Sequence, residues 1–192
     1  MMDMDQKKHL IMESAKQSFS LFGYKGTTMD QIAKIAGVGK ATIYSFFENK
    51  EELLHEIVQS LVAEMKAVAE KALTEGATTL ERIHGAIYGI LVLRKEERLL
   101  IQLAHEVQQF GNQVTRDALA GIETELVDFI AQHIARAIQN GTMKNCDPKM
   151  TAFIMYKLYI ALVFDWEKNN EPLTDERISE LLKLYFGNFL SS

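Results

Sequence analysis

The stretch from Thr27 to Leu54 places the strongest constraint on how this chain can fold. It reads TTMDQIAKIAGVGKATIYSFFENKEELL, which predicts two short helices, a tight turn and the start of a longer helix. Thr28 and Gln31 have the spacing of a capping box, and Gly37 is the residue type that most often ends a helix in the left-handed conformation. The first short helix is therefore expected to open at Thr28 and to end before Gly37.

The second short helix, Lys40 to about Phe47, cannot be stable by itself, because isolated helices below roughly 12 residues are marginal in water. Packing of Ile43 and Phe47 must hold it in place. Its other face carries groups that can hydrogen-bond, which suits a helix-turn-helix that enters the DNA major groove. The residues expected to contact DNA are Thr27, Thr28, Lys40, Ala41, Thr42, Tyr44, Ser45 and Lys50.

A longer helix is predicted to begin at Lys50. Asn49 is its expected cap, with Glu52 returning a hydrogen bond to the backbone of Asn49. Its apolar stripe continues to near Gly76, so it would span on the order of 35 Å at 1.5 Å per residue, enough to link two domains.

The segment IAKIAGVGKATIYSFFENKEELL resembles the DNA-binding signature of the TetR family of one-component transcriptional regulators. Two departures are mild: Gly39 stands where the family often has a serine cap, and Phe46 where a histidine is common. The resemblance implies a dimeric regulator, most often a repressor, that a small molecule releases from its operator. It extends upstream through four residues expected to face the core, Ile11, Ala15, Phe19 and Phe22.

The formal net charge of −5 is low for a DNA-binding protein, but the charge is unevenly distributed. Residues 6–50 contain seven lysines and three acidic residues, a net +4 that leaves −9 for the rest of the chain. A basic head on an acidic body is consistent with DNA binding at one end. A chance distribution is an equally open explanation of this asymmetry.

The fold is predicted to be all-α, because no segment shows strand alternation and the chain holds only two prolines. We expect a helix-turn-helix DNA-binding domain at 1–50 and a helical regulatory and dimerisation domain at 51–192. The nine predicted helices are 5–22, 28–36, 40–47, 50–76, 78–93, 98–110, 113–139, 148–168 and 175–190.

No run of 18 apolar residues and no secretory leader is present, so we expect a cytoplasmic protein without a membrane partner. Cys146 is the only cysteine, which excludes an internal disulfide and a cysteine zinc site.

The last two helices are apolar on nearly every side, which favours burial against a second copy of the chain. A monomer that buries these residues internally is the alternative. The expected homodimer interface contains Phe153, Tyr156, Ile160, Phe164, Leu181, Leu184 and Tyr185.

A small-molecule effector would bind among the middle helices, in a mostly apolar pocket with a few orienting polar groups. The same residues can instead be interfacial or surface residues. The candidate lining residues are His84, Tyr88, His105, Gln109, Phe110, Met155, Tyr156 and Trp166.

Two Glu-x-x-His pairs, Glu52 with His55 and Glu81 with His84, have the spacing found in di-metal carboxylate bundles. Both glutamates lie in a first helical turn with a capping role, Glu81 in a capping box with Thr78, which argues against a metal site. No catalytic motif is visible, so we expect no enzyme activity, no cofactor and no metal. The alternatives are a helical ligand-binding protein or a di-metal carboxylate enzyme, in either case without regulatory DNA binding.

Overall fold

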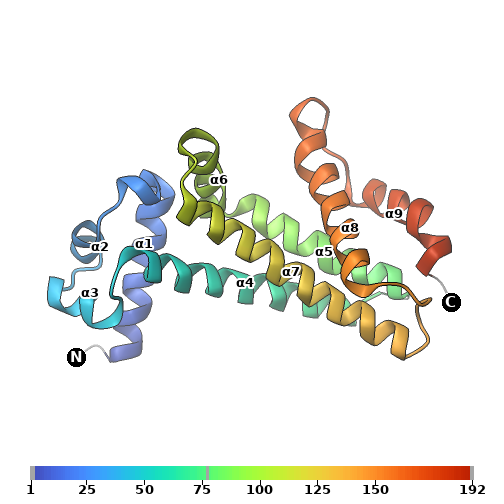
Figure 1. The fold of residues 1–192 in the computed structure, drawn as a ribbon, viewed down its shortest axis with the longest axis horizontal. Coiled ribbons are helices and arrows are strands. Elements are labelled where there is room, and N and C mark those ends of the chain that lie inside the picture. The colour runs from blue at the N-terminus through green and yellow to red at the C-terminus, as the bar shows by residue number, and fades with distance from the viewer. Residues whose placement is uncertain (1–2, 77, 191–192) are drawn as a thin grey trace. The chain divides into compact units, whose positions relative to one another are not determined.

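The computed structural model describes residues 3–76 and 78–190, and this part of the chain is built from helices without a strand. The all-α prediction with nine α-helices is confirmed within these residues (Figure 1). No helix there combines the length and the low polarity that a membrane span requires. The helices are α1 (Met4–Gly26), α2 (Met29–Ile35), α3 (Lys40–Phe46), α4 (Lys50–Thr74), α5 (Thr79–Glu96), α6 (Arg98–Phe110), α7 (Gln113–Gln139), α8 (Pro148–Ile160) and α9 (Asp175–Leu190).

The chain divides into two compact units. The first unit comprises Met1–Val62 and Lys95–Ile122, and the second comprises Ala63–Arg94 and Glu123–Ser192. Helices α4, α5 and α7 each contribute residues to both units. This grouping assigns α6 to the same unit as the predicted head, so a domain boundary at residue 50 stays a prediction.

Helix α1 forms the centre of the first unit. Ile11, Ala15 and Phe19 are fully buried, as predicted. Phe22 was expected to join them, but its side chain is 61% exposed. The helical path is interrupted directly after it, at Gly23, where φ is 77° and ψ is 165°. The prediction for Phe22 is wrong because the regular helical spacing stops there.

Helices α2 and α3 lie beside α1 (Figure 1). The predicted capping box is present, since Thr28 Oγ1 accepts from the Gln31 N–H and Gln31 Oε1 accepts from the Thr28 N–H. Gly37 adopts φ 64° directly after α2, a left-handed conformation that glycine tolerates best. Helix α3 begins after Gly39 without a side-chain cap. Packing therefore has to stabilise α3, as its length predicted.

The start of α4 differs from the sequence prediction in one bond. Asn49 Oδ1 accepts from the Glu52 N–H at 2.9 Å, which is the expected cap. The Glu52 carboxylate accepts from the Glu48 N–H at 2.6 Å rather than from that of Asn49. The reciprocal bond thus reaches one residue further back, and it still satisfies a backbone donor at the helix start.

Helix α8 is shorter than predicted. It ends at Ile160, and the chain continues as a π-helix over Ala161–Asp165 and a 3-10 turn over Trp166–Lys168. No proline or glycine lies between Ile160 and Lys168, so hydrophobic periodicity gives no sign of the change. π-helical turns are rare and frequently occur at functional sites.

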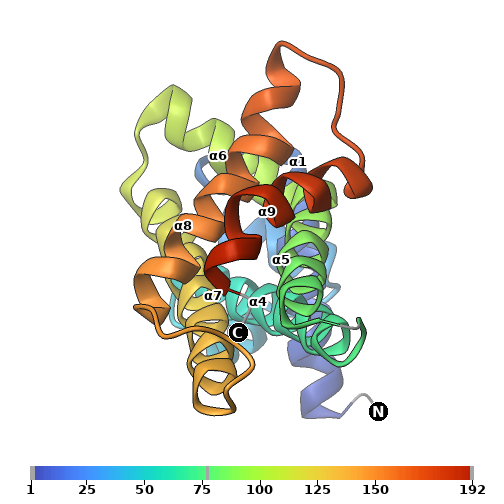
Figure 2. The same cartoon turned by 90° about the vertical axis from the view of Figure 1, so that its right-hand side faces the viewer.

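A partly buried hydrogen-bond chain connects α5, α8 and α9 within the second unit, and all three helices are labelled in Figure 2. His84 of α5 contacts the Tyr159 hydroxyl of α8 through Nδ1 at 2.5 Å and the Asp175 carboxylate of α9 through Nε2 at 2.9 Å. A carboxylate only accepts, so Nε2 carries the proton and Nδ1 accepts from the Tyr159 O–H. Neutral His84 can therefore bond to the Tyr159 hydroxyl and the Asp175 carboxylate at the same time.

Burial lowers the pKa of His84 below its usual 6.5, and the nearby Asp175 carboxylate offsets only part of this shift. A depressed pKa in the folded state means that the stabilising contribution is present above about pH 6.5 and is lost as pH falls through the lowered value. Lys183 and Glu81 also face this histidine, and they pair with each other at 3.2 Å.

We expect acid to destabilise the wild-type protein more than a His84→Asn variant between pH 7.5 and pH 5. Urea unfolding at several pH values measures this difference, because the variant lacks the group whose protonation breaks the chain of bonds. Equal pH slopes for the two proteins would contradict the assignment.

Candidate nucleic-acid interface

Helix α3 presents its polar face outward because its apolar face is buried. Ile43 is fully buried and the following Phe47 is 1% exposed, which fixes the orientation of the helix. Lys40, Ala41, Tyr44 and Ser45 are exposed, and Thr42 is half-buried. These are the α3 residues predicted to contact DNA. The Ser45 hydroxyl already donates to the Thr42 carbonyl at 2.7 Å, so it offers a base or phosphate mainly its acceptor lone pairs.

A surface hollow of about 330 Å³ lies where α2, α3 and the start of α4 meet, and we call it the α2–α3 hollow. It brings together five of the eight predicted DNA-contacting residues. Its lining residues are Thr27, Thr28, Met29, Asp30, Lys40, Tyr44 and Lys50.

Asp30 and Met29 are the two hollow residues that were not predicted from the sequence, and Asp30 is the charged one. Its carboxylate accepts from Lys40 Nζ at 2.9 Å, and both side chains are more than 60% exposed. The bond to Asp30 raises the pKa of Lys40, so this lysine stays charged. A phosphate that approaches Lys40 must compete with the Asp30 carboxylate. The ten-residue separation of the pair matches no helical spacing, so no local pattern in the sequence indicates it.

Thr27 has a structural position. Its side chain is fully buried, and Oγ1 donates to the Gly23 carbonyl at 2.8 Å and lies 3.1 Å from the Ser18 hydroxyl. The side chain therefore closes the turn before α2, and the contact of Thr27 with DNA stays a prediction. Thr28 remains exposed and is the residue of this pair that can face a phosphate.

Lys50 is largely engaged inside the first unit. Its Nζ donates to the carbonyls of Tyr24 and Thr27 at 2.6 and 2.8 Å and lies 4.3 Å from the centre of the Tyr24 ring. Partial burial lowers the pKa of Lys50, and the negative charge of Glu106 offsets part of this shift. Two of its three N–H groups are used in this way, so at most one is left for the predicted phosphate contact.

The eight predicted ligand-lining residues divide between the two units. His105, Gln109 and Phe110 are exposed on α6 in the first unit, where Lys25 Nζ lies 5.0 Å from the centre of the Phe110 ring. The other five belong to the second unit. Trp166 is 45% exposed there and donates from Nε1 to the Glu171 carbonyl.

Two groups of the second unit combine predicted and unpredicted residues. Tyr88 stacks on His84 with ring centres 5.8 Å apart, and Tyr159 was not foreseen as the hydrogen-bond partner of His84. The buried Tyr156 hydroxyl accepts from Arg94 Nη1 at 2.6 Å, and Arg94 also lies 5.7 Å from the Phe164 ring. Tyr88 lies four residues after its partner His84, whereas Tyr156 and Tyr159 bond to residues more than 60 positions away in the chain.

The His84 contacts also bear on the rejected metal site. Glu81 forms the expected capping box with Thr78, and both nitrogens of His84 are hydrogen-bonded. A metal at this pair would have to break the cap and the bond to Tyr159 or Asp175.

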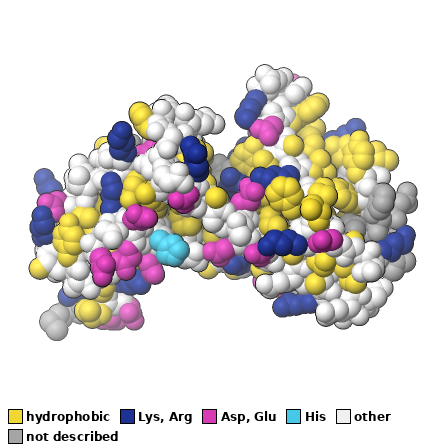
Figure 3. All heavy atoms as spheres, viewed as in Figure 1, with side chains coloured by type: hydrophobic (Ala, Val, Ile, Leu, Met, Phe, Trp, Pro, Cys, Tyr) yellow, Lys and Arg dark blue, Asp and Glu magenta, His cyan; other side chains and the backbone are white. Residues whose placement is uncertain are grey.

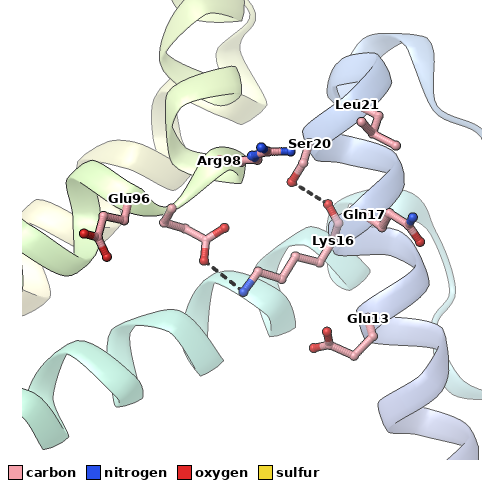
Figure 4. Close-up of a pocket in the computed structure, with 8 residues that line it drawn as sticks. Glu13, Lys16, Gln17, Ser20, Leu21, Glu96 and Arg98 are labelled. Carbon is pink, nitrogen blue, oxygen red and sulfur yellow. Dashed lines mark hydrogen bonds and ion pairs between the residues drawn. The ribbon is translucent and has the colours of Figure 1, made fainter.

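Two further hollows contain none of the predicted ligand residues. One, of about 410 Å³, lies in the first unit against α1 and the corner before α6, and Figure 4 shows its charged lining with Lys16 paired to Glu97 at 2.9 Å. The other, in the second unit, holds about 10 Å³, which is room for about one water molecule. Its lining residues are Leu73, Ile83, Ala86, Ile87, Phe129, Ile130 and His133.

Comparison with known proteins agrees with this geometry. Residues 11–57 match the model of the family described as bacterial regulatory proteins, tetR family. The uncharacterized HTH-type transcriptional regulator YhgD of Bacillus subtilis is 46% identical over 191 residues, which covers 100% of both chains.

Two solved structures are similar over nearly the whole chain. AibR in complex with isovaleryl coenzyme A and operator DNA is 26% identical, with a TM-score of 0.58 and coverage of 94% of this chain and 98% of that one. The SmeT–triclosan complex is 20% identical, with a TM-score of 0.71 and coverage of 97% and 92%. The second likeness bears on the fold alone.

We expect Tyr44→Ala and Lys40→Ala to weaken DNA binding about fivefold to tenfold each, the effect of one lost polar contact. The thermal midpoint should move by less than about 2 °C, because both side chains are exposed. Asp30→Asn should change affinity in the opposite direction at low salt, since it removes the carboxylate that competes for Lys40. Fluorescence anisotropy with labelled duplex DNA measures all three, and unaltered affinity in both alanine variants would contradict the assignment of α3.

Lys50→Met should behave differently from Lys40→Ala. Loss of the ammonium removes the donor of the Thr27 carbonyl and leaves the Tyr24 carbonyl only the long bond from the Thr27 N–H at 3.4 Å, which costs about 1–3 kcal/mol of unfolding free energy. Thermal unfolding followed by circular dichroism should show a midpoint several degrees lower than that of wild type. A midpoint equal to that of Lys40→Ala would show that Lys50 does not hold the turn.

Proposed function

Because the chain belongs to the tetR family of bacterial regulatory proteins and is a DNA-binding transcriptional regulator, we propose that it acts as a repressor. In this proposal a homodimer binds a palindromic operator, and a small, largely apolar ligand releases it. The observation that carries the proposal is the exposed polar face of α3 beside the α2–α3 hollow.

The two recognition surfaces of a dimer would read half-sites about one helical turn apart, roughly 34–36 Å. Exposed Tyr44 and Thr28 would contact base edges or phosphates, and Lys40 would neutralise a phosphate once it leaves Asp30. Phosphate contacts set the position of the head, whereas only the α3 side chains that reach base edges would select the sequence.

An apolar surface on α8 and α9 supports the homodimer (Figure 3). Phe153 is 43% exposed on α8, and Leu184 and Tyr185 are 69% and 61% exposed on α9, so large apolar side chains gather on these two helices. Ile160, Phe164 and Leu181 are half-buried and can contribute to the same surface. Tyr156 is fully buried within its own unit, so we remove it from the proposed interface.

The proposed release mechanism depends on continuous helices. A ligand between helices of the second unit would tilt α4, which runs without interruption from Lys50 to Thr74. The tilt would change the separation of the two heads, so the recognition helices would no longer match successive grooves. Coupling of this kind is reciprocal, and operator DNA should therefore weaken the ligand. The likeness to AibR, whose structure holds isovaleryl coenzyme A and operator DNA, supports a ligand and an operator in one protein.

The first experiment is a selection of random duplex DNA on the purified protein, followed by a salt titration of the selected sequence. A palindrome bound by a dimer, with log affinity falling by about 0.9 per phosphate contact and decade of salt, is the expected result. Non-specific binding alone, also after the protein has been unfolded and refolded to strip bound ligand, would contradict the proposal.

We expect Leu184→Asp to shift the protein from dimer to monomer and to weaken operator binding at least tenfold, because a buried unpaired carboxylate is costly at an interface. Ile101→Asp, on the exposed face of α6, is the matched control, since Ile101 is 43% exposed outside the proposed interface. Analytical ultracentrifugation and anisotropy measure the two effects. A Leu184→Asp variant that remains a dimer would exclude this surface.

A further inference from the structure

Glu106 is a buried carboxylate that the DNA-binding surface does not explain. It lies on α6 in the first unit, and only 3% of the residue is exposed. Its Oε1 accepts from the Lys25 N–H at 3.1 Å, and its Oε2 is buried without a hydrogen-bond partner in the described part of the chain. Burying a carboxylate oxygen in this way costs free energy, so its position calls for a physical reason.

The carboxylate fits into the break in α1. A Cβ atom added to Gly23 would lie 2.1 Å from Glu106 Oε1, so only glycine leaves room for this approach. Gly23 also has φ 77°, which other residues rarely adopt. The buried position of the Glu106 carboxylate therefore depends on glycine at the break in α1.

The turn after this break is held from two sides. On one side Glu106 accepts from the Lys25 N–H, and on the other Lys50 Nζ donates to the Tyr24 and Thr27 carbonyls. Burial lowers the pKa of Lys50, and the negative charge of Glu106 offsets part of that shift. A carboxylate from α6 and an ammonium from α4 thus fix residues 24–27 together.

This turn leads directly into the DNA-facing surface. Thr27 closes it through the bond to the Gly23 carbonyl, and Thr28 is the N-cap of α2. Thr27, Thr28 and Lys50 all line the α2–α3 hollow. A shift of the turn would therefore move the start of α2 relative to α3.

We propose that Glu106 is a positioning residue for DNA recognition, which from α6 holds the turn 23–28 and with it the start of α2 and the Lys50 ammonium at the DNA-binding surface. The proposal rests on the assignment of the α2–α3 hollow to DNA. It places a determinant of operator affinity on a helix that lies outside residues 1–50 and carries none of the predicted DNA-contacting residues.

The test compares Glu106→Leu, Glu106→Gln and the control Gln108→Leu, an exposed position on the same helix. Glu106→Leu removes the acceptor and the charge, and should weaken binding of the selected duplex about tenfold, the worth of one hydrogen bond to a charged group. Glu106→Gln keeps an acceptor for the Lys25 N–H and should recover most of that loss. Each affinity is measured at a temperature where circular dichroism shows the variant fully folded.

Hydrogen exchange supplies a readout that does not need an operator. The amides of residues 24–31 should exchange faster in Glu106→Leu than in wild type or Gln108→Leu, while those of α9 should be unchanged. A merely structural role would instead accelerate exchange throughout the first unit and would not be rescued by Glu106→Gln. Unchanged exchange at residues 24–31 overturns the proposal.

Comparison with Tyr44→Ala separates this proposal from the proposed DNA surface. If Tyr44→Ala weakens binding but Glu106→Leu does not, the surface stands and the positioning role is wrong. If Glu106→Leu, Tyr44→Ala and Lys40→Ala all leave affinity unchanged, the surface itself is wrong.

Discussion

The burial of Ile43 and Phe47 is the interaction on which the DNA-binding surface depends. A helix of seven residues gains too few backbone hydrogen bonds to offset the cost of nucleation, and α3 has no side-chain cap. Helix α3 is stable because its apolar side is covered: Ile43 and Phe47 are each at most 1% exposed. The same burial turns Tyr44 and Lys40 outward. Stability and recognition therefore come from opposite faces of one short helix.

The turn between α1 and α2 is bonded to side chains from α4 and α6. Lysine and glutamate are usually surface residues, yet Lys50 and Glu106 both point into this turn. Their opposite charges and their bonds to backbone groups reduce the cost of burial. Polar contacts therefore stabilise the first unit at the turn 24–27.

The second unit uses a comparable arrangement at His84. One neutral imidazole satisfies a buried tyrosine hydroxyl and a half-exposed carboxylate, and so connects α5, α8 and α9. Apolar contacts are tolerant of small displacements, whereas this chain of bonds requires one protonation state and one geometry. It thereby fixes α9, which carries part of the exposed apolar surface proposed for dimerisation.

The sequence by itself determined the helices with clear local signals. Thr28 with Gln31, Thr78 with Glu81, and Asp147 before Pro148 mark helix starts through bonds between near neighbours, and the structure has all three. The burial of Ile43 and Phe47 could be predicted as well, because residues four apart lie on the same face of a helix. The family resemblance located the DNA-binding segment, since that segment has a recognisable order of residues.

Only the tertiary structure decided which polar side chains are free. Thr27 and Lys50 look like DNA contacts in the sequence, but their partners at Gly23, Ser18 and Tyr24 occupy them. Asp30 opposite Lys40 and Glu106 opposite Lys25 involve separations that no periodic pattern encodes. Bonds between near neighbours can be predicted from the spacing of residues along the chain. Burial and long-range pairing depend on where the folded chain brings distant segments together.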